Sequence, residues 1–302
     1  FLPAPADDAT FATVKAALLE YLKARTGGTV PISLKQTWEE IPEATDLLDT
    51  YTGAAVGYSL RRIKSTATNA IRVRRSSNND EQDIGFVDGE LDTVSLLAFV
   101  GTAGTDNGYV KIWYDQASTY DATQTDTAKQ PQIVSSGAVV VDTNGSPAMD
   151  FTGTQELTSA SITAIAQPST AISVVDTTGR TAQTNYFYSL GLTAWATIQD
   201  NGSDMKMYAG SFVTGTSGSG ANTQRLDFSL FDGANSEIWF NNSSILTGNP
   251  GTRGISGIRI GGFNVPTFQG YFSEFIAYPS DQDAAANRAG IQDNINTFYN
   301  IY

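Results

Sequence analysis

The stretch that decides the fold is Ile71-Arg72-Val73-Arg74, in which apolar and charged residues alternate with a period of two. The same alternation returns in Val110–Tyr114 and in Leu226–Leu230. Successive side chains of a β-strand point to opposite faces of the sheet, so this pattern predicts strands that bury one face. We therefore expect antiparallel sheets that pack one side against a core.

Short apolar runs continue this pattern along most of the chain, at 139–141, 148–151, 171–175, 186–190, 205–208, 237–240, 257–260 and 270–278. Between them lie clusters of Gly, Asn, Asp and Ser, which are typical of turns, at 142–145, 200–202 and 232–233. About a dozen short strands at this spacing predict a mainly β protein, an antiparallel sandwich or jelly roll.

An amphipathic helix is predicted near the N-terminus, with apolar residues at three- and four-residue spacing from Phe11 to Leu22. Its apolar face would pack on its own domain or form a short bundle with other copies, because two heptads are marginal alone. Pro31 and Pro42 limit strand pairing in the segment that follows. We interpret residues 1–46 as a helix and extended attachment segment, and residues 47–302 as the β-sandwich domain.

Two more helices are expected within the β region. The first spans Leu91–Val100, opens at Asp92-Thr93, and would lie across one end of the sandwich. The second would begin at the capping residue Ser280. Its apolar face would consist of Ile291, Ile295, Phe298, Tyr299 and Tyr302. We expect this C-terminal helix to seal one face of a sheet.

Composition narrows the possible partners. The chain has 18 Lys and Arg against 31 Asp and Glu, a formal charge of −13. Nucleic acid and anionic membranes would be repelled over most of such a surface, so neither is an expected partner. No stretch approaches the roughly 20 apolar residues that span a bilayer.

The chain contains no Cys and no His, which excludes thiol and imidazole chemistry. A hydrolase would have to use carboxylates, and a metal would have to be a hard cation held by oxygens. Acidic residues near predicted turns could hold calcium, but their spacing favours solvated turn acids: Asp200, Asp204, Asp227 and Asp232. No phosphate-binding loop or nucleotide fingerprint occurs, so we expect no cofactor and no metal.

Several short motifs occur in the order found in one family: Ala55–Arg62, Ile71–Ser77, Asp83–Phe86, Trp113–Gln116 and Ala122–Gln124. They resemble the opening of the α-L-arabinofuranosidase B catalytic domain, copies of which also occur in bacteriophage virion proteins. The resemblance implies a concanavalin A-like β-sandwich. It covers roughly residues 50–155 and returns at Gly261-Gly262 and at 270–281.

Catalysis in that family needs two carboxyl groups about 5–5.5 Å apart. The resemblance places the acid/base at Gly261–Asn264 and the nucleophile at Tyr188–Thr193. Neither stretch contains Asp or Glu. We therefore expect no catalytic residue and a protein that is not an enzyme.

Trp113, Tyr114, Asp115 and Gln116 are the candidate ligand-binding residues, together with Trp195. An aromatic ring can stack on a sugar while amide and carboxylate groups bind its hydroxyls. The alternative for 113–116 is a core strand whose Asp115 caps the next turn.

Positive charge is concentrated in Arg61, Arg62, Arg72, Arg74 and Arg75. These arginines would grip an anionic glycan or a partner subunit, or would pair with nearby acids such as Asp80, Glu81 and Asp83. The second alternative is favoured.

Together these features favour a non-enzymatic bacteriophage structural protein, located in the virion. It would display a carbohydrate-binding-like sandwich on tail, fibre, baseplate or capsid, and adhere to a host-surface glycan. Residues 1–46 would contact other virion subunits, with the chain as a homo-oligomer. The alternatives are an active arabinofuranosidase-type glycoside hydrolase that uses two carboxylates, and a secreted carbohydrate-binding module.

Overall fold

The computed structural model describes residues 46–180, 185–191, 196–200, 204–215, 223–263, 265–284 and 286–302. All of them belong to the second of the two units into which the chain divides, Asp46–Tyr302. The predicted helix between Phe11 and Leu22 lies outside the described residues, as do Trp195 and nearly all of the attachment segment. Among the helices that are described, none has the length and apolar character needed to cross a membrane.

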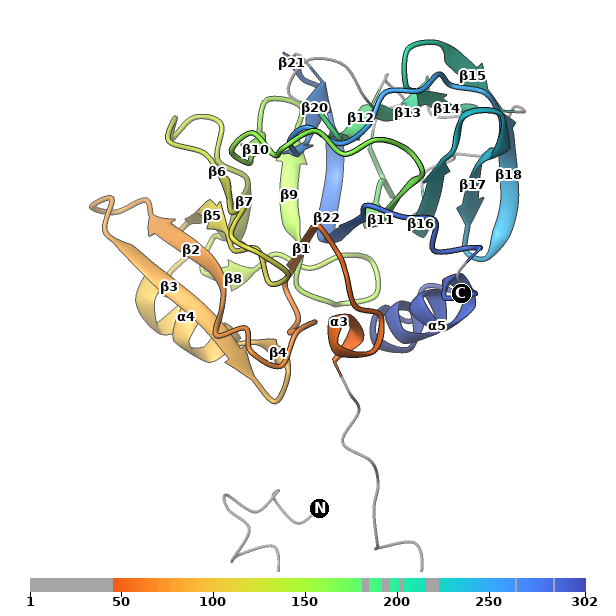
Figure 1. Cartoon of the computed structure of the whole chain (residues 1–302). Helices are drawn as coiled ribbons and strands as arrows, with labels where there is room; N and C mark the ends of the chain where they lie inside the picture. The colour runs from red at the N-terminus through yellow and green to blue at the C-terminus, as the bar shows by residue number, and fades with distance from the viewer. Residues whose placement is uncertain are drawn as a thin grey trace, which may run out of the picture. The chain divides into compact units, whose positions relative to one another are not determined.

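Antiparallel strands form two layers (Figure 1). In spatial order, the first layer contains β3 (Glu81–Val87), β2 (Asn69–Arg75), β5 (Gly108–Trp113), β7 (Gln132–Ser135), β9 (Met149–Thr152), β22 (Gln269–Tyr278), β11 (Ser169–Asp176), β16 (Gln224–Phe231), β17 (Ser236–Phe240) and β18 (Ser243–Gly248). The second contains β6 (Ala122–Thr123), β10 (Leu157–Thr158), β19 (Arg259–Ile260), β12 (Asn185–Ser189), β13 (Ala196–Asp200), β14 (Asp204–Tyr208) and β15 (Phe212–Thr214). Strand β6 also pairs with β5 and joins the layers.

The remaining strands are short additions to this frame. Strand β1 (Val56–Ser59) pairs with β22, β4 (Glu90–Leu91) with β3, and β8 (Ala138–Val139) with β7. Strands β20 (Gly262–Phe263) and β21 (Val265–Pro266) pair with each other. The mainly β sandwich predicted from the alternating pattern is confirmed.

The main core is rich in aromatic rings. Trp113 lies with its ring centroid 5.7 Å from that of Tyr58 and 6.0 Å from that of Phe272, and all three side chains are fully buried. Phe272 in turn contacts Phe151 and Phe268. Burial of such large side chains supplies most of the hydrophobic stabilisation of a β-sandwich.

The predicted short helix is confirmed as α4 (Thr93–Val100). The Asp92 carboxylate accepts a hydrogen bond from the backbone N–H of Ser95 at 2.9 Å and caps its N-terminus. Leu96 and Val100 are buried in the main core, so the helix covers apolar side chains of the sheet.

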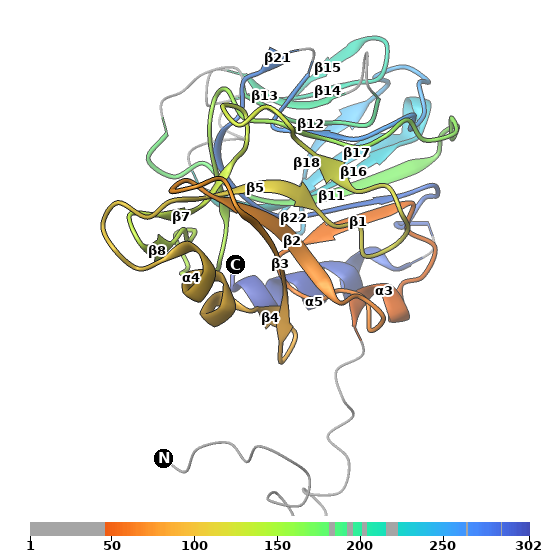
Figure 2. The same cartoon turned by 90° about the vertical axis from the view of Figure 1, so that its left-hand side faces the viewer.

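A second core lies between the first layer and two helices, α3 (Leu47–Thr50) and α5 (Arg288–Tyr299) (Figure 2). It includes Ile276 and Tyr278 of β22 and, from the helices, Leu47, Leu48, Ile291, Ile295 and Tyr299. The predicted C-terminal helix therefore does seal a sheet face.

The limits of that helix differ from the prediction at both ends. It begins at Arg288 because the Asp281 carboxylate accepts hydrogen bonds from the backbone of Asp283 and Ala284 and closes a turn instead. It ends at Tyr299, and the next residue, Asn300, has a left-handed conformation. Tyr302 follows this stop and is 47% exposed, so it does not belong to the buried face.

Candidate functional site

The predicted ligand residue Trp113 is a core residue. Its side chain is 0% exposed, and its ring packs against Tyr58 and Phe272. A ring that stacks on a sugar must present a face to solvent. The structure therefore corrects the sugar-stacking interpretation of Trp113, while Trp195 lies outside the described residues.

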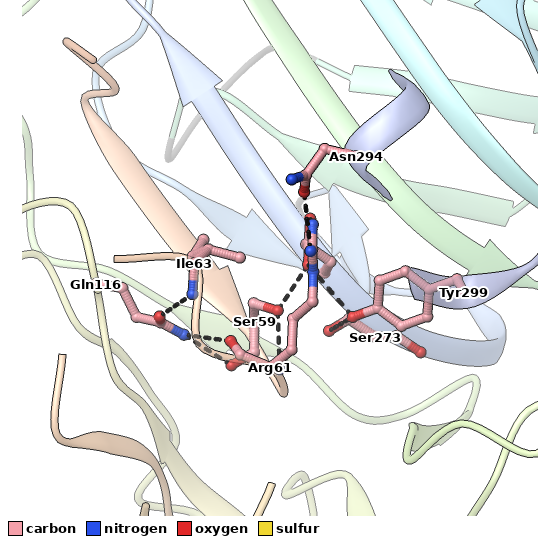
Figure 3. Close-up of polar contacts among 8 residues, drawn as sticks. Ser59, Arg61, Ile63, Gln116, Ser273, Asn294 and Tyr299 are labelled. Carbon is pink, nitrogen blue, oxygen red and sulfur yellow. Dashed lines mark hydrogen bonds and ion pairs between the residues drawn. The ribbon is translucent and has the colours of Figure 1, made fainter. Parts of the chain in front are cut away.

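The side chains of Asp115 and Gln116 form hydrogen bonds with backbone groups of the protein, which leaves them poorly suited to bind a ligand. The Asp115 carboxylate accepts hydrogen bonds from the backbone N–H groups of Gly57, Ala117 and Tyr120. The Gln116 amide donates to the carbonyls of Ser59 and Arg61 and accepts from the Ile63 N–H (Figure 3). The alternative interpretation, a core strand with Asp115 capping the following turn, describes what is seen.

Tyr114, Asp115 and Gln116 do line a hollow of about 310 Å³, which also includes residues 64 and 66–69. The Tyr114 hydroxyl donates a 2.7 Å hydrogen bond to Asp83. Burial, followed by this bond to a carboxylate, raises the pKa of Tyr114 to about 12. The polar ends of the three side chains are thus already engaged within the protein.

The arginines pair with acids, as favoured from the sequence, with one exception. Arg72 pairs with Asp83 and Arg75 with Asp80, while Arg61 pairs with Glu274 and Arg62 with Asp46. Arg74 instead donates to two neutral amides, those of Gln130 and Asn79. Arg74 does not line the hollow at Tyr114 but a second, separate groove on the surface.

A groove of about 380 Å³ lies at Arg74. Its lining is almost entirely polar and consists of Arg74, Tyr109, Thr127, Ala128, Gln130, Gln132, Asp150, Thr152 and Gln155. The loop before β7 and the loop after β9 contribute Gln130 and Gln155, and the remaining polar groups come mostly from strands.

Strand register explains why these groups meet. Arg74 pairs directly with Tyr109, Tyr109 with Gln132, Gln132 with Asp150, and Asp150 with Tyr271. Directly opposed residues of neighbouring strands lie on the same face of a sheet. We call these five residues the polar row, and it crosses strands β2, β5, β7, β9 and β22.

The other face of the same strands belongs to the core. Val73, Val110, Phe151 and Phe272 are each next in sequence to a member of the polar row and are fully buried. The alternation of the strands therefore sets an apolar face against the aromatic core and leaves the polar row on the opposite face.

Two arginines stack on the two tyrosines of the row. The guanidinium carbon of Arg74 lies 5.0 Å from the ring centroid of Tyr109, and that of Arg180 lies 4.5 Å from the ring centroid of Tyr271. Arg180 also forms an ion pair with Asp150. Burial raises the pKa of Asp150 above its ordinary value, while Arg180 acts in the opposite direction.

Several polar atoms of the groove have no hydrogen-bond partner among the described residues: the Tyr109 hydroxyl, the Gln132 Oε1 and the Gln155 Nε2. Fixed amides, a hydroxyl and half-buried aromatic rings are the groups that bind sugar hydroxyls and C–H faces. The groove offers recognition chemistry, and it holds one carboxylate, that of Asp150.

The predicted turn acids have different environments. Asp227 is not in a turn: it lies within β16, is 1% exposed and is paired with Arg225. Burial raises the pKa of Asp227 to about 6. Asp232 accepts a hydrogen bond from Asn235 in a turn, as expected. In the part of the chain that is described, no group of acidic side chains has an arrangement that would hold a metal.

This β-sandwich fold is one that a solved glycoside hydrolase also has. It is similar to that of a GH54 α-L-arabinofuranosidase mutant soaked with 4-nitrophenyl α-L-arabinofuranoside, with a TM-score of 0.54 and 17% sequence identity. The match covers 82% of this chain and 64% of that chain, so this chain spans less than two thirds of its structural relative. At this identity the likeness establishes a shared fold.

Two further solved structures match with lower TM-scores. Trypanosoma rangeli sialidase has a TM-score of 0.43 and 13% identity, over 64% of this chain and 32% of that chain. Domain 4 of AbnA, a GH43 arabinanase from Geobacillus stearothermophilus in complex with arabinotriose, has a TM-score of 0.37 and 12% identity, over 46% and 74%. Neither family models nor curated protein sequences gave a match.

Proposed function

We propose that this chain is a non-enzymatic glycan-binding protein and that the groove at Arg74, Tyr109 and Asp150 is its binding site. The observation that carries the proposal is the polar row. It places two half-buried tyrosine rings, an arginine, an amide and a carboxylate along one face of the sheet, and Arg180 stacks on the second ring. Sugars are bound by such mixtures of stacking surface and fixed hydrogen-bonding groups.

The absence of catalysis is the second part of the proposal. The Gly261-Gly262 pair is followed by Phe263 and Asn264, so the stretch that resembles the acid/base segment carries no carboxylate. The buried Asp227 lies 3.4 Å from Arg225 and is engaged in an ion pair. A retaining mechanism requires two carboxyl groups that flank the scissile bond.

Binding is tested on a glycan array with the wild type and two tyrosine variants. Tyr109→Ala removes the ring that Arg74 covers, and we expect it to abolish binding. Tyr114→Ala is the matched control, because Tyr114 follows the same strand but lines the other hollow. Loss of binding in Tyr114→Ala with retention in Tyr109→Ala would move the site to that hollow.

Hydrolysis is the competing function, and the fold shared with an arabinofuranosidase favours it. We expect no release of arabinose from arabinoxylan and no turnover of a chromogenic arabinofuranoside. Turnover above a buffer blank that is abolished by changing a single Asp or Glu would establish an enzyme.

We also propose that the protein is a component of a bacteriophage particle. The support is the resemblance of its sequence motifs to domains carried by phage virion proteins. Residues 1–46 would contact other subunits, and several copies would display their grooves together. Mass spectrometry of purified particles tests this placement. A protein secreted without any particle would instead be a free carbohydrate-binding module.

A further inference from the structure

Arg74 differs from the cations around it in having no acidic partner. Within the described residues, no carboxylate lies within ion-pair distance of its guanidinium, and its two hydrogen-bond acceptors are neutral. The neighbouring cations are all paired with acids: Arg72 with Asp83, Arg75 with Asp80, Lys111 with Glu81, Lys129 with Glu156, and Arg180 with Asp150. An unpaired cation is unexpected in a chain with a net charge of −13.

The guanidinium of Arg74 is held in one position. Its Nε donates to Gln130 Oε1 at 2.8 Å, its Nη1 donates to Asn79 Oδ1 at 2.8 Å, and its plane lies over Tyr109. Arg74 is 8% exposed and Gln130 is 2% exposed. Desolvating a charge costs free energy unless another charge compensates for it, and amide oxygens carry no net charge. The site therefore has an uncompensated positive charge at the groove.

The other residues of the groove indicate which kind of anion would bind to Arg74. The Asp150 carboxylate lines the same groove and would repel a highly charged ligand such as a polyphosphate more strongly than a ligand with a single negative charge. A sugar carboxylate brings a single charge to Arg74 and hydroxyl groups to Gln132, Thr152 and Gln155. Arginine binds carboxylates through charge-assisted hydrogen bonds that are about twice as strong as neutral ones.

We propose that the groove binds an acidic glycan, with the carboxylate of a uronic or sialic acid residue placed on Arg74. This inference rests on the proposed glycan-binding function and adds the chemical class of the ligand. Because every cation near the groove except Arg74 already has an acidic partner, Arg74 determines the preference for acidic over neutral sugars.

The test compares each acidic oligosaccharide with its methyl ester, which has the same sugars but no charge. Oligogalacturonic acid and oligosialic acid are titrated into the full chain alongside their esters and a sulfated oligosaccharide. We expect the wild type to bind one of the acids about tenfold more tightly than its ester, as one charge-assisted bond predicts. Added salt should weaken this preference.

Two variants locate the preference. Arg74→Met removes the cation, and Gln130→Glu keeps it but supplies the missing carboxylate beside Nε with almost no change in shape. Both should bind acid and ester equally. Arg72→Met is the matched control, because Arg72 lies two residues away on the same strand and outside the groove, and it should keep the preference. Gln130→Glu keeps the Arg74 cation and gives up only the hydrogen bond that Gln130 Nε2 donates to the Gln124 carbonyl, so it tests the inference even if Arg74→Met fails to fold.

The outcomes separate the two proposals. Equal binding of acid and ester by the wild type would overturn the role of Arg74 and leave glycan binding intact. Binding to neutral glycans of the array alone, or stronger binding to the sulfated oligosaccharide than to either acid, would also overturn it. Binding to no glycan at all would overturn the proposed function itself.

Discussion

Arg61 and Glu274 form a buried ion pair, with Arg61 Nε 2.7 Å from Glu274 Oε2 and both side chains less than a tenth exposed. The Ser59 hydroxyl donates to the same carboxylate, and Asn294 accepts from Arg61 Nη1. The pair therefore connects the chain after β1, the long strand β22 and the helix α5. Glu274 is at the centre of these contacts, because its carboxylate accepts hydrogen bonds from both Ser59 and Arg61.

Replacing Glu274 by Gln should destabilise the protein strongly. The substitution keeps the shape of the side chain but leaves the Arg61 charge buried without its partner, which typically costs about 3–5 kcal/mol of unfolding free energy. Urea denaturation of the two proteins measures the difference. In Arg72→Gln, which breaks a half-exposed pair with Asp83, the loss should stay below about 1 kcal/mol. Equal effects of the two substitutions would contradict the structural role of the buried pair.

Trp113→Ala should reduce stability without removing the binding site. The indole is fully buried, and truncating such a side chain costs about 3–5 kcal/mol. At temperatures where the variant remains folded, its glycan affinity should match that of the wild type. Thermal unfolding and a binding titration on the same sample check both halves. A variant with unchanged stability and lost binding would restore Trp113 as a ligand residue.

The start of the folded domain can be tested by truncation. Leu47 and Leu48 are 1% and 3% exposed and contribute to the core beneath α5. A chain that begins at Asp46 should therefore unfold cooperatively with a melting temperature close to that of the full protein. A chain that begins at Asp49 lacks both leucines and should melt at a lower temperature. If the two truncated chains melt alike, α3 is not part of the core.

Asp49 should contribute a stability that depends on pH. Its hydrogen bond from Lys64, together with one from the Ser65 backbone, lowers its pKa from 3.8 to about 2. The folded state thus favours the charged form, so this stability is present above pH 3.8 and is lost as the pH falls through about 2. Asp49→Asn should lower the unfolding free energy at pH 7 by less than about 1 kcal/mol, because the group is near the surface. Chemical denaturation between pH 7 and 2 should show the two proteins converging, and a constant difference would exclude the charge as the cause.

Alanine substitutions at two hairpin glycines distinguish the cost of backbone strain from the cost of a steric clash. Gly89 and Gly137 have φ angles of +82° and +77°, where an L-residue costs roughly 1–2 kcal/mol. A Cβ on Gly89 would meet nothing within 4 Å, whereas one on Gly137 would lie 2.4 Å from the backbone of Thr102. Gly137→Ala should therefore be clearly more destabilising than Gly89→Ala. Equal melting temperatures would show that the chain near Thr102 moves freely aside.

The sandwich could be predicted from the sequence because strands such as β9 and β14 bury one face, and burial of one face leaves a period-two pattern. The helix α4 was equally visible, since Asp92 both ends one element and caps the next. The start of α5 was not, because Ser280 and Asp281 have the composition of a cap but form a turn whose bonds depend on Thr170, far away in the sequence.

The candidate site was the hardest part to predict. The residues 113–116 stand out in the sequence because they are needed to fold the strand and its turn. The polar row has no local signal: Gln132 and Asp150 are ordinary residues until the strand register sets them side by side. Arg74 was recognised only as one of five arginines, and the lack of an acid beside it is visible only in three dimensions.

The polar row draws one residue from each of five strands, from Arg74 to Tyr271. No short peptide cut from this protein contains the complete row, because its members are spread from residue 74 to residue 271. During synthesis on the ribosome, four of its members are made long before β22, because strands β10 to β21 lie between β9 and β22 in the sequence. A nascent or truncated chain without that strand lacks Tyr271 and the ring on which Arg180 stacks, so the complete row marks the arrival of β22 in the sheet.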